Sequence, residues 1–272
     1  MDAATTGTPD RDGERGGTGH DGAMEPGADI ERRNRGRVER SGKRVRAVFA
    51  GEVVADTTAP LLVWEVPYYP AYYLPREHVR TDLIVATGRS RTSPTRGEGL
   101  IGHLRVGDRE AADAVTEYPE SPLPVLRGTV RLDFAAMDAW FEEDEEIHTH
   151  PRDPYVRVDV LPSSRHVRVE VDGVTVAESH SPRLLFETNL PTRYYLPKPH
   201  VRLDLLEPSD RVTYCPYKGR AEYWSVRTGA GRVDDLVWSY PTPSTESERI
   251  AGLLAFPQER ADVFVDGVRQ ER

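Results

Sequence analysis

The only cysteine of the chain, Cys215, lies in the segment YCPYKGRAEYW, residues 214–224, three positions before Lys218. The reactive form of cysteine is the thiolate, and an ordinary thiol with a pKa of about 8.5 is mostly protonated at neutral pH. In a Cys-Pro-Tyr-Lys-Gly turn the lysine could lie near the sulfur and favour its ionised form, which would make Cys215 a nucleophile. Equally, Cys215 could be a small buried side chain at a turn, as free cysteines often are.

Three charged or titratable residues join Cys215 as candidates. Lys218 could bind a carboxylate or phosphate, or be a solvated turn lysine. Glu187 ends the apolar run LLFE, where a buried carboxylate must be paired, hydrogen-bonded or functional. His200 could carry a proton if the fold brings it to the sulfur, although a capping or packing role explains it equally well. The predicted catalytic set is Cys215, Lys218, Glu187 and His200, with a structural ion pair between Glu187 and Arg202 as the alternative for the carboxylate.

Aromatic side chains near the same segment could line a ligand pocket, although aromatic residues of strands lie more often in the core. Alternation along AEYWSVR places Tyr223 and Trp224 on opposite faces of a strand, so only one of them can point into a shared cavity. The predicted substrate-binding residues are Tyr194, Tyr217, Arg202, Tyr223, Trp224 and Trp238.

A weak metal-binding pattern lies in EEDEEIHTHP, residues 142–151. His148 and His150 would share one face of a strand beside carboxylates. An acidic linker explains the same residues better. The sequence therefore predicts no metal site, and it names no cofactor.

The elements that must position these residues form a long internal repeat at an offset of 122 residues. Residues 44–84 align without a gap with residues 166–206, and 17 of the 41 positions are identical. The chain is therefore two copies of one domain. The first copy is predicted at 41–141 and the second at 164–272, joined by an acidic linker and connecting strand at 142–163.

Each copy is predicted to be mainly β (α+β): a small compact barrel or folded sheet with one or two short helices. Asp172-Gly173 lies between two valine-rich runs, which predicts a hairpin over 167–178. Further strands are predicted at 183–187, 221–227, 233–239 and 261–265.

Two short helices are predicted in the second copy. In TESERIAGLLAF, Thr245 and Glu248 have the spacing of a capping box, apolar residues follow at helical intervals through Leu254, and Pro257 would end the helix. A second short helix or turn is predicted to begin at Pro197.

Composition limits the location and the partners. Residues 1–40 hold almost no large apolar groups and are predicted to be a disordered tail. A net charge of −9 disfavours nucleic acid and anionic membranes as partners. A single cysteine, no signal-peptide core and no long apolar run predict a soluble cytoplasmic protein, with a small molecule as its partner. The oligomeric state stays unknown.

Several motifs of the second copy resemble the DUF427 family, which also carries a nucleotidyltransferase-like name. They are YYLP at 194–197, CPYKGRAEYW at 215–224, and LVWSYPTP followed by ESERIAGLLAF. The resemblance covers residues 166–269, whereas the first, degenerate copy has Ser93 and Arg96 in the places of Cys215 and Lys218. It implies a small, mostly β domain in tandem and names no activity. The chain has neither a phosphate-binding glycine loop nor a polymerase-like pair of aspartates.

Two functions follow as hypotheses. The first is an enzyme that acts on a small anionic metabolite or nucleotide at a cleft of the second copy that contains Cys215 and Lys218. The alternative is a non-catalytic ligand-binding or protein-interaction module built from a pseudo-symmetric tandem pair. The two copies differ most at the sulfur, the lysine and the surrounding rings, so the second copy is the expected place of a single site.

Overall fold

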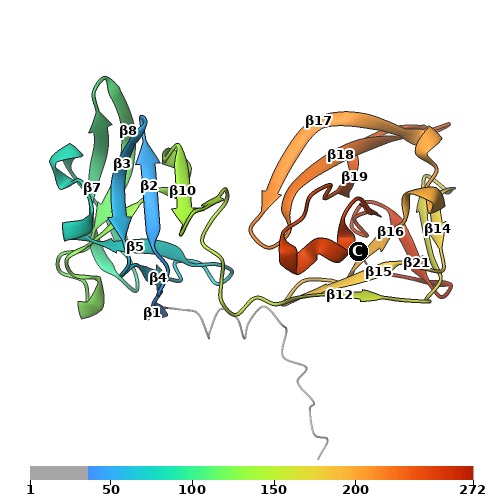
Figure 1. Ribbon diagram of the computed structural model, residues 1–272, viewed down its shortest axis with the longest axis horizontal. Coiled ribbons are helices and arrows are strands. Elements are labelled where there is room, and N and C mark those ends of the chain that lie inside the picture. Colours follow the sequence, from blue (N-terminus) through green and yellow to red (C-terminus); the bar gives the residue numbers. More distant parts are fainter. Residues whose placement is uncertain (1–35, 272) are drawn as a thin grey trace, which may run out of the picture.

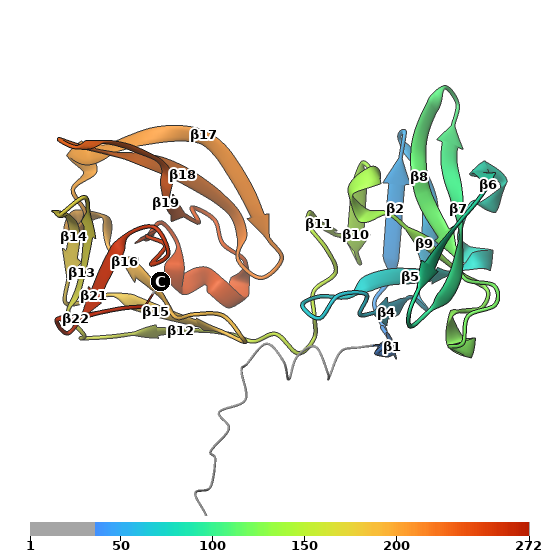
Figure 2. The same cartoon turned by 180° about the vertical axis from the view of Figure 1, so that it is seen from behind.

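A computed structural model describes residues 36–271 and shows two lobes, one for each copy of the repeat (Figures 1 and 2). The prediction of two tandem, mainly β domains is confirmed, because each lobe contains a seven-stranded and a four-stranded sheet. Most of the predicted tail lies outside the described residues. Its last residues, Val38–Arg40, form strand β1 and pair with β4 (Leu61–Val63).

The two domains have matching sheets. In the first domain the larger sheet has the order β1, β4, β5 (Ala71–Pro75), β9 (Thr129–Leu132), β8 (Arg109–Glu117), β7 (Gly97–Val106), β6 (Ile84–Ser93), and the smaller has the order β11 (Glu145–Ile147), β10 (Ala139–Glu142), β2 (Val45–Phe49), β3 (Glu52–Thr57). In the second domain the larger sheet has the order β12 (Val158–Pro162), β15 (Arg183–Glu187), β16 (Arg193–Leu196), β20 (Leu254–Ala255), β19 (Gly231–Ser239), β18 (Gly219–Thr228), β17 (Leu206–Cys215), and the smaller has the order β14 (Val174–Ser179), β13 (Val167–Val171), β21 (Asp262–Val265), β22 (Val268–Arg269).

Helical structure consists of short 3₁₀ segments in the described part of the chain. They are η1 (Arg76–His78), η2 (Thr81–Leu83), η3 (Pro124–Leu126), η4 (Phe134–Ala136), η5 (Lys198–His200), η6 (Leu203–Leu205) and η7 (Thr245–Ile250). Within residues 36–271, no helix has the length and apolar character needed to cross a bilayer.

The central strands of each large sheet bury side chains on both faces. In the second domain, Tyr194 and Leu196 of β16 lie in the main core between the two sheets. Tyr195 between them points to the opposite face, where it joins Leu185, Tyr240 and others in a second, smaller apolar cluster. Because successive side chains of a strand alternate between faces, neighbouring tyrosines serve two different cores.

The predicted hairpin at Asp172-Gly173 is confirmed. Asp172 has a φ of 50° and Gly173 a φ of 76°, so both central residues adopt the positive φ that a tight primed turn requires. The predicted strands at 183–187, 221–227, 233–239 and 261–265 correspond to β15, β18, β19 and β21.

The helix predicted through Leu254 is shorter than expected. The 3₁₀ segment η7 ends at Ile250, and Leu254–Ala255 forms β20 between β16 and β19. The backbone of β20 completes the sheet, and a helix over the same residues would leave that ladder unmade. No side chain caps the start of η7; the hydroxyls of Ser244 and Ser247 instead donate to the carbonyl of Tyr217. The predicted turn after Pro197 is confirmed as η5.

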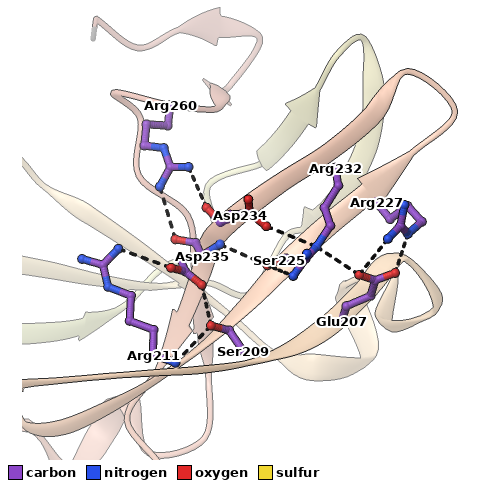
Figure 3. A network of polar contacts seen from close by, with 9 residues as sticks. All are labelled: Glu207, Ser209, Arg211, Ser225, Arg227, Arg232, Asp234, Asp235 and Arg260. Carbon is purple, nitrogen blue, oxygen red and sulfur yellow. Dashed lines mark hydrogen bonds and ion pairs between the residues drawn. The ribbon is translucent and has the colours of Figure 1, made fainter.

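Strands β17, β18 and β19 curve strongly around the second domain, and a polar network stabilises the bend (Figures 1 and 3). The strand register shifts between Ser209 and Val212 and again between Trp224 and Val226. Asp235 lies at this bend with a φ of 50°, and its carboxylate accepts a hydrogen bond from the Ser209 hydroxyl. In the first domain Asp113 has a φ of 57° and pairs with Arg89, so the bend belongs to the repeat unit.

We expect Asp235→Val to lower the free energy of unfolding by about 2 kcal/mol, because a β-branched residue is strained at positive φ and Ser209 loses its acceptor. Urea unfolding would measure the loss. Asp234→Val is the matched control, since the Asp234 side chain is 69% exposed and its φ is not positive. Equal stability of the two variants would contradict a structural role for Asp235.

Candidate functional site at the junction of the two domains

Glu187 and Lys218 form a buried ion pair in the second domain. Glu187 is the last residue of β15, and Lys218 lies in the turn between β17 and β18, where its backbone N–H donates to the Cys215 carbonyl over 3.3 Å. The side chains are 8% and 11% exposed, and the lysine Nζ donates to Glu187 Oε2. The positive charge of Lys218 is therefore neutralised inside the protein.

The expected pair between Glu187 and Arg202 does not form. Arg202 binds Asp204, two residues away, with Nε 2.8 Å from the Asp204 Oδ1 atom at the exposed surface. The first domain repeats this arrangement with Arg80 and Asp82. Because Asp204 is only two residues away, forming this ion pair costs little conformational entropy of the chain. Arg202 is held at the surface and lines none of the cavities described below.

His200 lies on η5, where its Nδ1 atom is 2.8 Å from the Ser179 hydroxyl. His78 makes the same contact with Thr57 in the first domain. His200 does not line either of the cavities that contain Cys215. The structure therefore brings Cys215, Lys218 and Glu187 together and leaves His200, the fourth predicted catalytic residue, at an exposed position where it contacts Ser179.

The side chains of both domains enclose one cavity of about 290 Å³, which we call the junction cavity. The first domain contributes the loop between β4 and β5, the second contributes the end of β15 and the turn after β17, and the connecting segment lies between them. The main lining residues are Arg37, Tyr68, Tyr69, His150, Asp153, Tyr155, Glu187, Leu190, Cys215 and Tyr217.

A second cavity of about 240 Å³ also contains Cys215 and is lined by His148, Arg152, Tyr214 and Arg220. Cys215 is thus a partly exposed thiol in the wall of two cavities.

Residues 142–163, predicted as a linker, include β11, which pairs in the first domain, and β12, which pairs in the second. Between them, Asp153 binds both domains. Its Oδ2 atom accepts a hydrogen bond from Trp64 Nε1 over 2.8 Å, and its backbone N–H donates to the Tyr217 hydroxyl over 2.8 Å. Tyr155 also donates to Glu39 over 2.8 Å. These contacts position the segment as a wall of the junction cavity.

His150 is the histidine that the structure places in the junction cavity. Its ring stacks on Tyr69 with centroids 4.1 Å apart, and its Nδ1 atom is 2.8 Å from the Pro151 carbonyl. Because a carbonyl only accepts, Nδ1 carries the proton and Nε2 is the acceptor in the neutral ring. Burial lowers the pKa of His150 below its usual value, which favours this neutral form.

The two histidines of the weak metal pattern do not act together. His148 lies against the ring of Tyr214 with centroids 4.5 Å apart, in the second of the two cavities. Among residues 36–271, no group of three or more histidine, cysteine, aspartate or glutamate side chains could hold a metal ion.

The predicted aromatic residues divide between two faces. Tyr223 and Trp238 lie with Cys215 in the smaller apolar cluster, whereas Trp224 packs against the main core, as alternation predicts. Tyr194 also faces the main core, and its hydroxyl bonds to Gln270 over 3.2 Å. The tyrosine on the cysteine side is Tyr195, whose hydroxyl accepts a hydrogen bond from Trp238 Nε1 over 3.1 Å.

Burial keeps the tyrosines of this region neutral. It raises the pKa of Tyr195, Tyr217 and Tyr240 well above the usual value. The lining residues that the sequence did not single out are Tyr68, Tyr69, Asp153 and Tyr155. Their signal in the sequence was the aromatic and polar composition of VPYYP, within the first copy of the repeat, and of RDPY, in the connecting segment.

The fold and the site define a tandem pair of mainly β domains that share one cavity. The profile of the family described as "Domain of unknown function (DUF427)" matches residues 37–143 and 159–267, so the chain belongs to this family and carries two copies of its domain. No match was found among the curated proteins.

We expect Lys218→Met to lower the free energy of unfolding by about 3 kcal/mol, because it leaves the buried Glu187 carboxylate without its cation. Lys198→Met, at an exposed position, is the matched control. Thermal or urea unfolding would measure both. A loss no larger than that of the control would show that the pair is not needed for folding.

We expect the stability of the protein to fall as the pH drops below the ordinary histidine pKa of about 6.5. The pKa of His150 is lowered in the folded protein, so the unfolded chain binds more protons there and acid favours unfolding. His150→Gln should give a shallower decrease between pH 7 and pH 5 in thermal unfolding, with His148→Gln as the control. An unchanged slope in His150→Gln would contradict this effect.

Proposed function

We propose that the protein binds a small planar molecule in the junction cavity. The observation that carries the proposal is the joint lining of one cavity of about 290 Å³ by both domains and the connecting segment. Its size lies near the lower end of small-molecule pockets, roughly 300–1,000 Å³, and aromatic walls with a few polar groups are typical of such sites. The rings of Tyr69, His150 and Tyr155 suit a flat ligand.

The ligand is not expected to be selected by a positive charge. Lys218, the predicted anion-binding residue, is paired with Glu187. Arg37, the arginine of the wall, lies 2.6 Å from Glu39 and stacks over the Tyr155 ring at 3.8 Å. We therefore propose a small-molecule ligand that need not be an anion. A cytoplasmic location and the absence of nucleic acid and membrane partners remain proposals that rest on composition.

Thiol chemistry is the second candidate function. Cys215 and His150 line the same cavity, and the neutral histidine offers Nε2 as an acceptor for the thiol proton. In this mechanism His150 replaces His200 as the base. The thiolate of Cys215 would then add to a carbonyl carbon of the bound ligand, the C=O π electrons would move to the oxygen, and the proton held on His150 Nε2 would pass to that oxygen.

Cys215 is the only cysteine and lines both the junction cavity and the second cavity, so its alkylation reports occupancy of either one. We expect compounds that raise the melting temperature in a screen of planar metabolites to slow the reaction of Cys215 with iodoacetamide at least tenfold. Mass spectrometry would measure the rate. Stabilising compounds that leave the rate unchanged would place the ligand elsewhere and contradict the proposal.

Cys215→Ser separates binding from chemistry, because serine is the residue that the first domain carries at this position. Retained binding of the same compounds is expected for a binding module. If a compound is turned over by the protein and Cys215→Ser binds it without turnover, the thiol mechanism is supported. Turnover by Cys215→Ser would rule that mechanism out.

A further inference from the structure

Both domains place a largely buried glutamate at or just after an apolar strand. It is Glu65 after β4 in the first domain and Glu187 at the end of β15 in the second, and the two carboxylates differ in their hydrogen bonds. In the first domain Glu65 accepts from the Tyr73 hydroxyl over 2.6 Å and from Arg131 Nε over 3.0 and 3.1 Å. Arg96 adds a cation 3.8 Å away. Both oxygens of Glu65 are therefore occupied.

In the second domain the equivalent Glu187 loses these partners through three changes. Lys218 replaces Arg96 and donates to Oε2 alone. The hydroxyl of Tyr195, the equivalent of Tyr73, accepts from Trp238 Nε1 and makes no hydrogen bond to the carboxylate. Strand pairing places Ala255 where the first domain has Arg131, since Thr116 pairs with Arg131 and its equivalent Trp238 pairs with Ala255.

One oxygen of Glu187 consequently has no partner among residues 36–271. The side-chain atoms that are sealed from solvent without a partner in this range are Arg46 Nε, Arg96 Nε and Ser239 Oγ. Oε1 of Glu187 is not one of them, so it keeps contact with solvent although the side chain is only 8% exposed. Glu187 lines the junction cavity, where a carboxylate oxygen with an unfilled acceptor site awaits a donor.

We propose that Glu187 selects the ligand of the junction cavity, and that this ligand is a planar ring with N–H donors on one edge, of the amidine or aminopyridine type. The inference rests on the proposed function and specifies its ligand. An ionised carboxylate only accepts hydrogen bonds, and N–H groups in the plane of a ring are the donors that fit it best. The carboxylate of Asp153, the other acid of the wall, already accepts from Trp64 Nε1 and from the Tyr155 N–H, so Glu187 is the acid that can accept from a ligand.

Three probes share one ring and differ at its edge: benzamidine, benzamide and benzoate. Isothermal titration calorimetry should give the tightest binding for benzamidine, weaker binding for benzamide and none for benzoate. Benzamidine should also slow the alkylation of Cys215, which places it in one of the two cavities that this side chain lines. Glu187 lines the junction cavity alone, so the effect of the Lys218 variant below distinguishes the two. Tighter binding of benzoate would make Lys218 the anchor and overturn the inference.

Lys218→Arg tests the free oxygen directly, because it imitates Arg96 of the first domain. A guanidinium can bind both oxygens of Glu187, so we expect benzamidine to bind at least tenfold more weakly while the melting temperature is kept. Lys198→Arg, at an exposed position, should bind benzamidine as the unmodified protein does. Unchanged affinity in Lys218→Arg would overturn the inference.

The two proposals fail in different ways. If the three probes do not bind while other compounds protect Cys215, the ligand class is wrong and the junction cavity remains a binding site. If neither the probes nor the screened compounds protect Cys215, the cavity is not a ligand site and both proposals fail.

Discussion

The arrangement of the site depends on Glu187. Its carboxylate lies in the protein interior at the end of the apolar strand β15, where it needs a positive charge beside it. In the second domain Lys218 provides the neutralising charge, which binds the turn after β17 to the end of β15. This contact carries Cys215 into the wall of the junction cavity, because the thiol lies three residues from the lysine in the same turn. A buried charge without its partner would be costly, so the turn is held in place.

The connecting segment joins the two similar domains around one cavity. Asp153 accepts from Trp64 of the first domain and donates through its backbone to Tyr217 of the second. Because both contacts are buried, breaking either would leave a polar group without a partner. The cavity walls are therefore built from three parts of the chain that are far apart in the sequence.

The two copies of the domain differ in how many hydrogen bonds their equivalent glutamate accepts. The first domain surrounds Glu65 with two arginines and a tyrosine hydroxyl, which is a closed structural network. The second domain keeps the carboxylate and removes most of its donors. The hydroxyl of Tyr195, which accepts from Trp238, makes no hydrogen bond to Glu187, unlike that of Tyr73 to Glu65. The retained carboxylate therefore accepts fewer hydrogen bonds in the second domain than in the first.

The sequence by itself determined the features that depend on local chemistry and on the repeat. The duplication, the β class, the Asp172-Gly173 turn and the opposite faces of Tyr223 and Trp224 follow from backbone geometry that neighbouring residues control. Only the tertiary structure decided which distant groups meet. Glu187 pairs with Lys218, 31 residues away, instead of Arg202, and His150 reaches the cavity while His200 does not. The strand at Leu254–Ala255 likewise depends on partners in β16 and β19, whose long-range backbone hydrogen bonds outweigh a local helical pattern.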